Sequence, residues 1–83
     1  MPTFMCERAF SPPLTAAAFA EGGKVLAPCL EVREVKWLGS NFATDGSRSV
    51  CMFEARDAES VREANRTAGM PFEKIWAASV FRP

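Results

Sequence analysis

The 83-residue chain contains no histidine. Histidine is the side chain most used for proton transfer near neutral pH, and it is the commonest ligand of transition metals in proteins. Its absence excludes active sites that depend on an imidazole base and removes the usual nitrogen ligand of a metal centre. The residues themselves therefore predict no transition-metal centre and no cofactor.

Cysteine is scarce as well. The three cysteines, Cys6, Cys29 and Cys51, are an odd number, and their spacing fits neither a disulfide framework nor a CxxC zinc site. We expect reduced thiols. Cys6 and Cys51 lie in apolar runs without a histidine to activate them, so core packing is a better interpretation than nucleophilic catalysis.

Long apolar runs and a charge excess of either sign are also missing. No run approaches the roughly 18 residues that span a membrane, and the chain starts with strand-like sequence instead of a targeting signal. We expect a cytoplasmic protein without a membrane partner. Ten basic residues balance ten acidic ones and the pI is about 6.2, so nucleic acid is not an expected partner either.

The composition is that of one globular domain, covering residues 1–83. Hydrophobic residues make up 48% of the chain and charged residues 24%, which is far from the composition of disordered proteins. A domain of this size buries only about 60% of the surface that its unfolded chain exposes. Association or a bound ligand would therefore stabilise it.

The chain alternates strand-like and helical segments. Strands are predicted over 3–10, 35–42, 49–55 and 72–81, and helices over 16–30 and 58–68. Thr15 and Asp57 are typical N-cap residues, and Gly69 is placed to end the second helix. Inside the first helix Gly22 and Gly23 are unfavourable, and Pro28 is expected to end or kink it.

The element order predicts an α+β fold of the ferredoxin-like βαββαβ type. Asp45-Gly46 is the dipeptide favoured by a two-residue type I′ turn, which would join the second and third strands in a hairpin. The expected result is a four-stranded antiparallel sheet with the strands in the order fourth, first, third, second, and with both helices on one face. The other face is then open.

The hairpin register predicts what the open face carries. With Asp45 and Gly46 as the two turn residues, Trp37 lies opposite Glu54 on the neighbouring strand, and both side chains point to the open face. Leu38 then points to the helices. A one-residue bulge would reverse this assignment. The predicted open-face site comprises Met5, Trp37, Asn41, Met52 and Trp76 as ligand-binding residues, with Glu7 and Glu54 as candidate catalytic acids.

Such a face is expected to be covered, because large apolar patches usually mark interaction surfaces. We therefore expect a homodimer in which two open faces pair, as in dimeric α/β-barrel proteins, around a cavity. Two carboxylates in one apolar cavity suit acid–base catalysis or a hard cation. Alternatively, each acid is ion-paired, for example Glu7 with Lys74.

Three functions stay open at this point. The first is a module that binds a small hydrophobic molecule or a metal ion in the cavity. The second is a cofactor-free enzyme that uses a cavity glutamate for proton transfer on a small aromatic or hydrophobic substrate. The third is a structural interaction protein in which the tryptophan and methionine side chains only form the dimer interface.

Several stretches of the chain resemble a known family. Segments 37–40, 45–48, 51–55, 57–66 and 68–72 are similar to the bacterial domain of unknown function 4242, also described as nickel-binding-protein-like. The resemblance covers nearly the whole chain. It implies a ferredoxin-like subunit that dimerises through its sheet, and it implies nickel as a possible bound metal.

Overall fold

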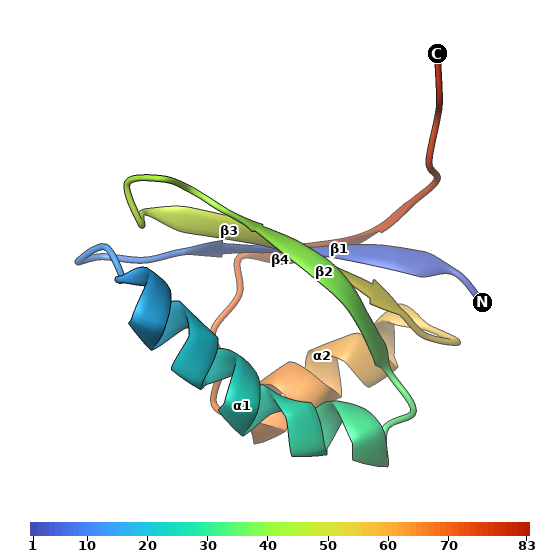
Figure 1. The fold of residues 1–83 in the computed structure, drawn as a ribbon. Helices are drawn as coiled ribbons and strands as arrows, with labels where there is room; N and C mark the ends of the chain where they lie inside the picture. Colours follow the sequence, from blue (N-terminus) through green and yellow to red (C-terminus); the bar gives the residue numbers. More distant parts are fainter.

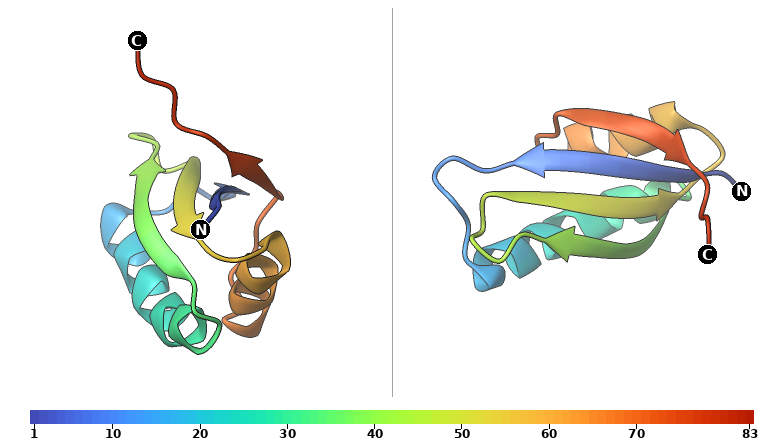
Figure 2. Two further views of the ribbon diagram at one scale, coloured as in Figure 1. Left: turned by 90° about the vertical axis from the view of Figure 1, so that its right-hand side faces the viewer. Right: turned by 90° about the horizontal axis from the view of Figure 1, so that it is seen from above.

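The chain forms a four-stranded antiparallel sheet with two helices packed against one face. Figure 1 shows this computed structural model, which describes all residues 1–83. The strand order is β2-β3-β1-β4, as predicted, and the view onto the open face shows the four strands side by side above the helices (Figure 2). The elements are β1 (Thr3–Ala9), α1 (Ala16–Val32), β2 (Lys36–Phe42), β3 (Arg48–Glu54), α2 (Ala58–Thr67) and β4 (Lys74–Ala78).

Both helices begin at the predicted caps. The Thr15 hydroxyl oxygen accepts a hydrogen bond from the backbone N–H of Ala18 at 3.1 Å, and the Asp57 carboxylate accepts one from that of Ser60 at 2.8 Å. These bonds satisfy N–H groups that lack a partner in the first turn. Gly69, with φ of 70°, follows the end of α2 as predicted.

Pro28 does not end α1, which continues to Val32. Proline has no N–H group, so the carbonyl of Lys24, one turn earlier, loses its helical partner. Both residues are on the exposed side of the helix, where water can bond to that carbonyl. Leu26 and Leu30, on either side of the proline, are buried in the core and hold both halves of the helix against the sheet.

The β2–β3 turn differs from the predicted type. The N–H of Gly46 donates to the carbonyl of Ala43 at 2.9 Å, and Ala43 itself pairs with Arg48, so four residues form the loop instead of two. Gly46 has φ of 77°, and a side chain there would overlap the Leu14 carbonyl. This glycine is required both by its left-handed backbone and by the lack of space.

A bulge in β2 overturns the predicted face of Trp37. The predicted register holds for Asn41, which pairs with Val50, and for Gly39, which pairs with Met52; beyond the bulge, Trp37 pairs with Phe53. Because one extra residue intervenes, the side chains before it change face. Trp37 lies on the helix side, and Leu38, expected in the core, is 43% exposed.

The glycines of α1 allow close contacts with this shifted side chain. A Cβ at Gly23 would lie 2.8 Å from Cη2 of Trp37, and a Cβ at Gly22 would lie 2.9 Å from Cε of Met70. Gly23 is buried under the rigid indole, whereas Gly22 faces the flexible end of a methionine. Glycine at position 23 is unfavourable for the helix, as predicted, but the close packing of Trp37 requires it.

The helix side of the sheet also buries a charged side chain. Arg8 of β1 is 1% exposed. Its Nη2 donates to Oδ1 of Asn65 in α2 at 2.6 Å, and its Nη1 donates to the carbonyl of Pro71 at 3.1 Å. Around this polar group the core consists of ten buried apolar residues: Phe4, Cys6, Leu26, Leu30, Val35, Cys51, Phe53, Ala55, Val61 and Ala64.

The two helix glycines provide a matched test of the packing. We expect Gly23→Ala to lower the free energy of unfolding by about 1–3 kcal/mol, because the new methyl displaces the Trp37 indole. Gly22→Ala should be neutral or stabilising by up to about 1 kcal/mol, since Met70 can rotate away and alanine favours the helix. Urea unfolding measures both. Equal effects of the two substitutions would contradict the assigned contact.

Candidate functional site

The open sheet face carries an apolar row that crosses all four strands. Cross-strand pairing joins Gly39 to Met52, Met52 to Met5, and Met5 to Trp76. Trp76 is 44% exposed, and the two methionines are half-buried. Gly39 offers no side chain to cover Met52. The sequence correctly placed Met5, Met52 and Trp76 together on this face.

Glu7 lies beside this row as its polar neighbour. Its Oε2 accepts a hydrogen bond from Nε1 of Trp76 at 2.7 Å. Nζ of Lys74 lies 3.6 Å from the same oxygen, and Nη2 of Arg48 lies 3.8 Å from Oε1. The Glu7 side chain is only 17% exposed. Of the two alternatives drawn from the sequence, the ion pair of Glu7 with Lys74 is therefore the one that forms.

Glu54 does not share a site with Glu7. Glu54 of β3 pairs with Thr3 of β1, whereas Glu7 of β1 pairs with Val50 of β3. Four residues along the strand separate the two acids, or roughly 13 Å, with the apolar row between them. The predicted pair of carboxylates is thus wrong: both acids are on the open face, but at opposite ends of it.

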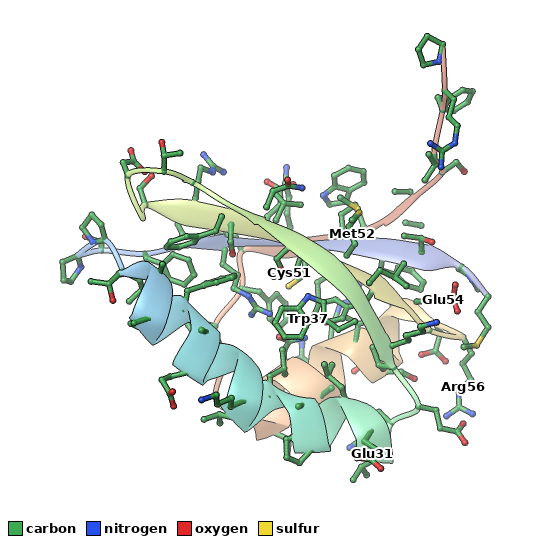
Figure 3. The ribbon with its side chains drawn as sticks, viewed as in Figure 1. Glu31, Trp37, Cys51, Met52, Glu54 and Arg56 are labelled. Carbon is green, nitrogen blue, oxygen red and sulfur yellow. The ribbon has the colours of Figure 1, made fainter.

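Trp37 is absent from the apolar row because of the β2 bulge. Figure 3 shows its indole beneath the sheet, toward α1, with Met52 above. Its Nε1 donates to the carbonyl of Gly39 at 3.1 Å and to Oγ of Ser40 at 2.9 Å. Asn41 keeps its predicted face and is exposed at the edge strand.

Arg48 is the site residue that the sequence interpretation missed. The signal for it is the register itself, since Arg48 follows the turn and pairs with Ala9, close to Glu7 on the neighbouring strand. Its Nη2 also lies 4.0 Å from Oε1 of Glu73. This end of the open face is therefore a small network of two cations and two carboxylates.

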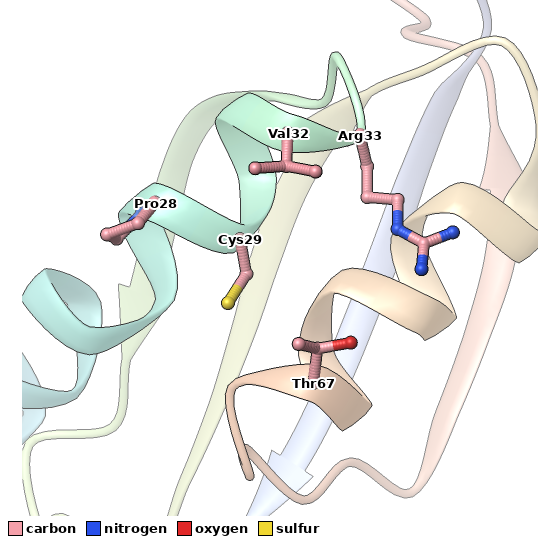
Figure 4. Close-up of a pocket in the computed structure, with 5 residues that line it drawn as sticks. All are labelled: Pro28, Cys29, Val32, Arg33 and Thr67. Carbon is pink, nitrogen blue, oxygen red and sulfur yellow. The ribbon is translucent and has the colours of Figure 1, made fainter.

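A pocket on the opposite side of the molecule opens between the two helices. Figure 4 shows the Cys29 thiol directed into the gap between α1 and α2, with Arg33 above it. The pocket has a volume of about 200 Å³ and is lined by Pro28, Cys29, Val32, Arg33 and Thr67. This is smaller than the roughly 300 Å³ at which ligand pockets typically begin.

The two other thiols are sealed in the core. Cys6 and Cys51 are direct partners on β1 and β3, and both are buried. Burial raises the pKa of the Cys6 thiol to about 11, against a smaller opposing effect of Arg8. Because the thiolate is the reactive form, Cys6 is suited to packing and not to nucleophilic chemistry.

Comparison with known proteins places the chain in a family. The family model described as nickel responsive protein SCO4226-like matches residues 4–77. The chain belongs to this family. The family number 4242 suggested by the sequence stays a prediction, although its association with nickel is compatible. No curated protein matches the chain significantly.

A solved structure shows the family fold. The crystal structure of SCO4226 from Streptomyces coelicolor A3(2) superposes with a TM-score of 0.86, covering 96% of this chain and 99% of that chain at 15% sequence identity. The ferredoxin-like architecture is therefore shown, whereas identity this low says nothing about shared site residues. None of the helices is long and apolar enough to cross a membrane.

The residues of this family member do not fit a nickel site within one subunit. Nickel favours imidazole and mixed nitrogen and oxygen ligands, and the chain has no histidine. No three cysteine, aspartate or glutamate side chains lie close enough to hold one ion. On the open face Glu7 is already engaged by Trp76, Lys74 and Arg48.

The two open-face acids differ in a way that can be measured. We expect Glu7→Gln to lower the free energy of unfolding by about 1 kcal/mol, because the charge-assisted bond from Trp76 weakens and two exposed cations lose a partner. Glu54 takes part in no ion pair. Glu54→Gln should cost less than about 0.5 kcal/mol. Urea unfolding that ranks Glu54→Gln as the costlier change would refute this assignment.

The raised pKa of Cys6 predicts a loss of stability at alkaline pH. The thiol ionises near 9.0 outside the fold and near 11 in the core. The stability that the neutral Cys6 thiol contributes is complete below the lower pKa and is lost as pH rises through the upper one. Between the two values only the unfolded chain forms the thiolate, which favours unfolding. The free energy of unfolding should thus fall from pH 9 to 11 less steeply in Cys6→Ala than in Cys29→Ala. Parallel slopes would rule this out.

Proposed function

We propose that the protein is a homodimeric binding module that encloses a small hydrophobic molecule between two open sheet faces. The observation that supports it is the row Gly39, Met52, Met5 and Trp76, which lies on the face that no helix covers (Figure 1). An apolar surface of this kind is typical of an interaction site.

The second copy is the partner that suits this face best. In a dimer with two-fold symmetry each subunit presents the same patch, so Met5, Met52 and Trp76 of one copy pack toward those of the other. Facing sheets lie about 10 Å apart when their side chains interdigitate. Because Gly39 has no side chain, the packed faces leave a gap above Met52, and this gap is the proposed ligand cavity.

The lining favours a small, mainly apolar ligand with one polar group. Methionine side chains are flexible and polarisable, so they adapt to ligands of different shape. The Trp76 indole supplies a flat surface for stacking. At one end of the row, Glu7 with Lys74 and Arg48 can orient a polar substituent. Asn41, exposed on the same face, is a further polar contact.

A metal ion receives less support as the ligand. Methionine sulfur is a weak, soft ligand, and Glu7 and Glu54, the two acids predicted to share a site, lie roughly 13 Å apart along the strands. The alternative of a glutamate-dependent enzyme stays a prediction from the sequence: with the carboxyl pair absent, no contact of the site favours proton transfer over binding.

The proposal predicts a dimer whose cavity depends on Trp76. We expect sedimentation to give a dimer at micromolar concentration, and native mass spectrometry to show the fluorescent probe anilinonaphthalene sulfonate bound to it. Trp76→Ala should weaken probe binding by roughly tenfold, since an indole contributes about 1.4 kcal/mol or more. Val25→Ala is the control because Val25 of α1 is 58% exposed and does not line the pocket between the helices.

Two results would overturn the proposed function. One is a monomer at all concentrations tested. The other is a dimer that binds neither the probe nor co-purified small molecules. A parallel titration with nickel chloride separates the metal alternative: stoichiometric nickel binding that survives Trp76→Ala would favour the metal over the hydrophobic ligand.

A further inference from the structure

The segment after β4 is an apolar arm that touches nothing in its own subunit's core. We define the arm as residues 79–83. Within it Val80 is 70% exposed and Phe81 is 93% exposed. Figure 1 shows the arm rising from the sheet on the side opposite to the helices. In the view from above it passes over the beginning of β1 (Figure 2).

We propose that the arm of each copy packs on the open sheet face of the other, so that Phe81 completes the partner's cavity. This inference rests on the proposed dimer and adds to it a specific residue that the partner supplies. The occupant of the open face is then a second copy together with its arm. The argument has three steps: reach, area and charge.

The arm is long enough to cross to the second sheet. Five extended residues span up to roughly 17 Å, whereas two facing sheets lie about 10 Å apart. The arm also starts in the right place, because Ala78 pairs with Thr3 next to the apolar row of Met5. A second sheet that packs on the open face therefore lies within reach of Val80 and Phe81.

The flat face alone is small for a stable dimer. Four strands of five to seven residues cover on the order of 400 Å² per copy at standard strand spacing, or about 800 Å² for two. Specific stable interfaces bury about 1,200–2,000 Å² in total. The two arms, each with a phenylalanine and a valine, supply apolar surface of the size that is missing.

Charge is also complementary. Arg82 at the end of the arm and Glu54 on the open face take part in no ion pair within one subunit. Glu54 pairs with Thr3 across the strands, at the same end of the sheet from which the arm leaves. A guanidinium brought onto the partner's face can thus meet a carboxylate that its cross-strand partner Lys36 does not engage in an ion pair. This favours the register over one that places Arg82 near Glu7, whose carboxylate is already paired with Lys74 and Arg48.

The arms should be detected directly by NMR. Copies with labelled methionine methyl groups are mixed with unlabelled copies, and contacts between chains are selected. We expect intermolecular contacts from the Phe81 ring to the methyl groups of Met5 or Met52. In sedimentation experiments Phe81→Ala should raise the dimer dissociation constant about tenfold or more. Val32→Ala, at an exposed apolar position of α1 outside the open face, should leave it unchanged.

The outcomes separate the arm from the dimer itself. If the wild-type protein dimerises but shows no intermolecular contact of Phe81, and if Phe81→Ala and removal of residues 79–83 leave the dissociation constant unchanged, the arm exchange is wrong and the proposed dimer stands. If the wild-type protein is a monomer, both are wrong. Intermolecular contacts with a weakened Phe81→Ala dimer support the arm exchange.

Discussion

The handedness of two chain crossovers determines which face of the sheet the helices cover and which face stays open. The connection β1–α1–β2 joins parallel strands on one side of the sheet order β2-β3-β1-β4, and β3–α2–β4 joins parallel strands in the opposite direction. Such crossovers are right-handed in nearly all proteins. The two connections cross the sheet in opposite directions, and the strands from which they start, β1 and β3, are antiparallel. With both crossovers right-handed, the two helices must therefore lie on the same face. The other face is left uncovered by topology, whatever its side chains.

The covered face buries one guanidinium, and its hydrogen-bond partners come from other parts of the fold. Arg8 is held by Asn65 and by the Pro71 carbonyl, and the amide of Asn65 donates to the Val61 carbonyl at 2.8 Å. Because these partners come from α2 and from the connection to β4, one guanidinium ties three parts of the chain together. Ser49 lies directly across from Arg8, and its hydroxyl oxygen is buried without a hydrogen-bond partner. The surrounding packing offsets the free-energy cost of burying this group.

The sequence allowed prediction of the element order, the caps and the sheet order, because these depend on local chemistry and on few topological rules. It did not allow prediction of the bulge at Leu38, which sends Trp37 to the helices. The neighbouring Gly39 is compatible with a bulge but does not require one. For the same reason the site was only partly predicted: Met5, Met52 and Trp76 follow plain alternation, whereas the pairing of Glu7 with Glu54 assumed that acids on adjacent strands are neighbours. The two acids lie four residues apart along the strands, so they are not neighbours. Pro28 was misjudged because buried leucines on both sides outweigh one lost hydrogen bond.

Membership of the family describes the fold, whereas the chemistry of the open face depends on individual side chains. A TM-score of 0.86 at 15% identity means that the fold persists while most side chains change. On the helix face changes are restricted, because contacts such as that of Gly23 with Trp37 leave no space. On the open face the fold requires only strands, so its row of side chains can be exchanged without loss of the architecture. The family description refers to a response to nickel, whereas the chemistry of this open face follows from its own methionines, tryptophan and engaged glutamate.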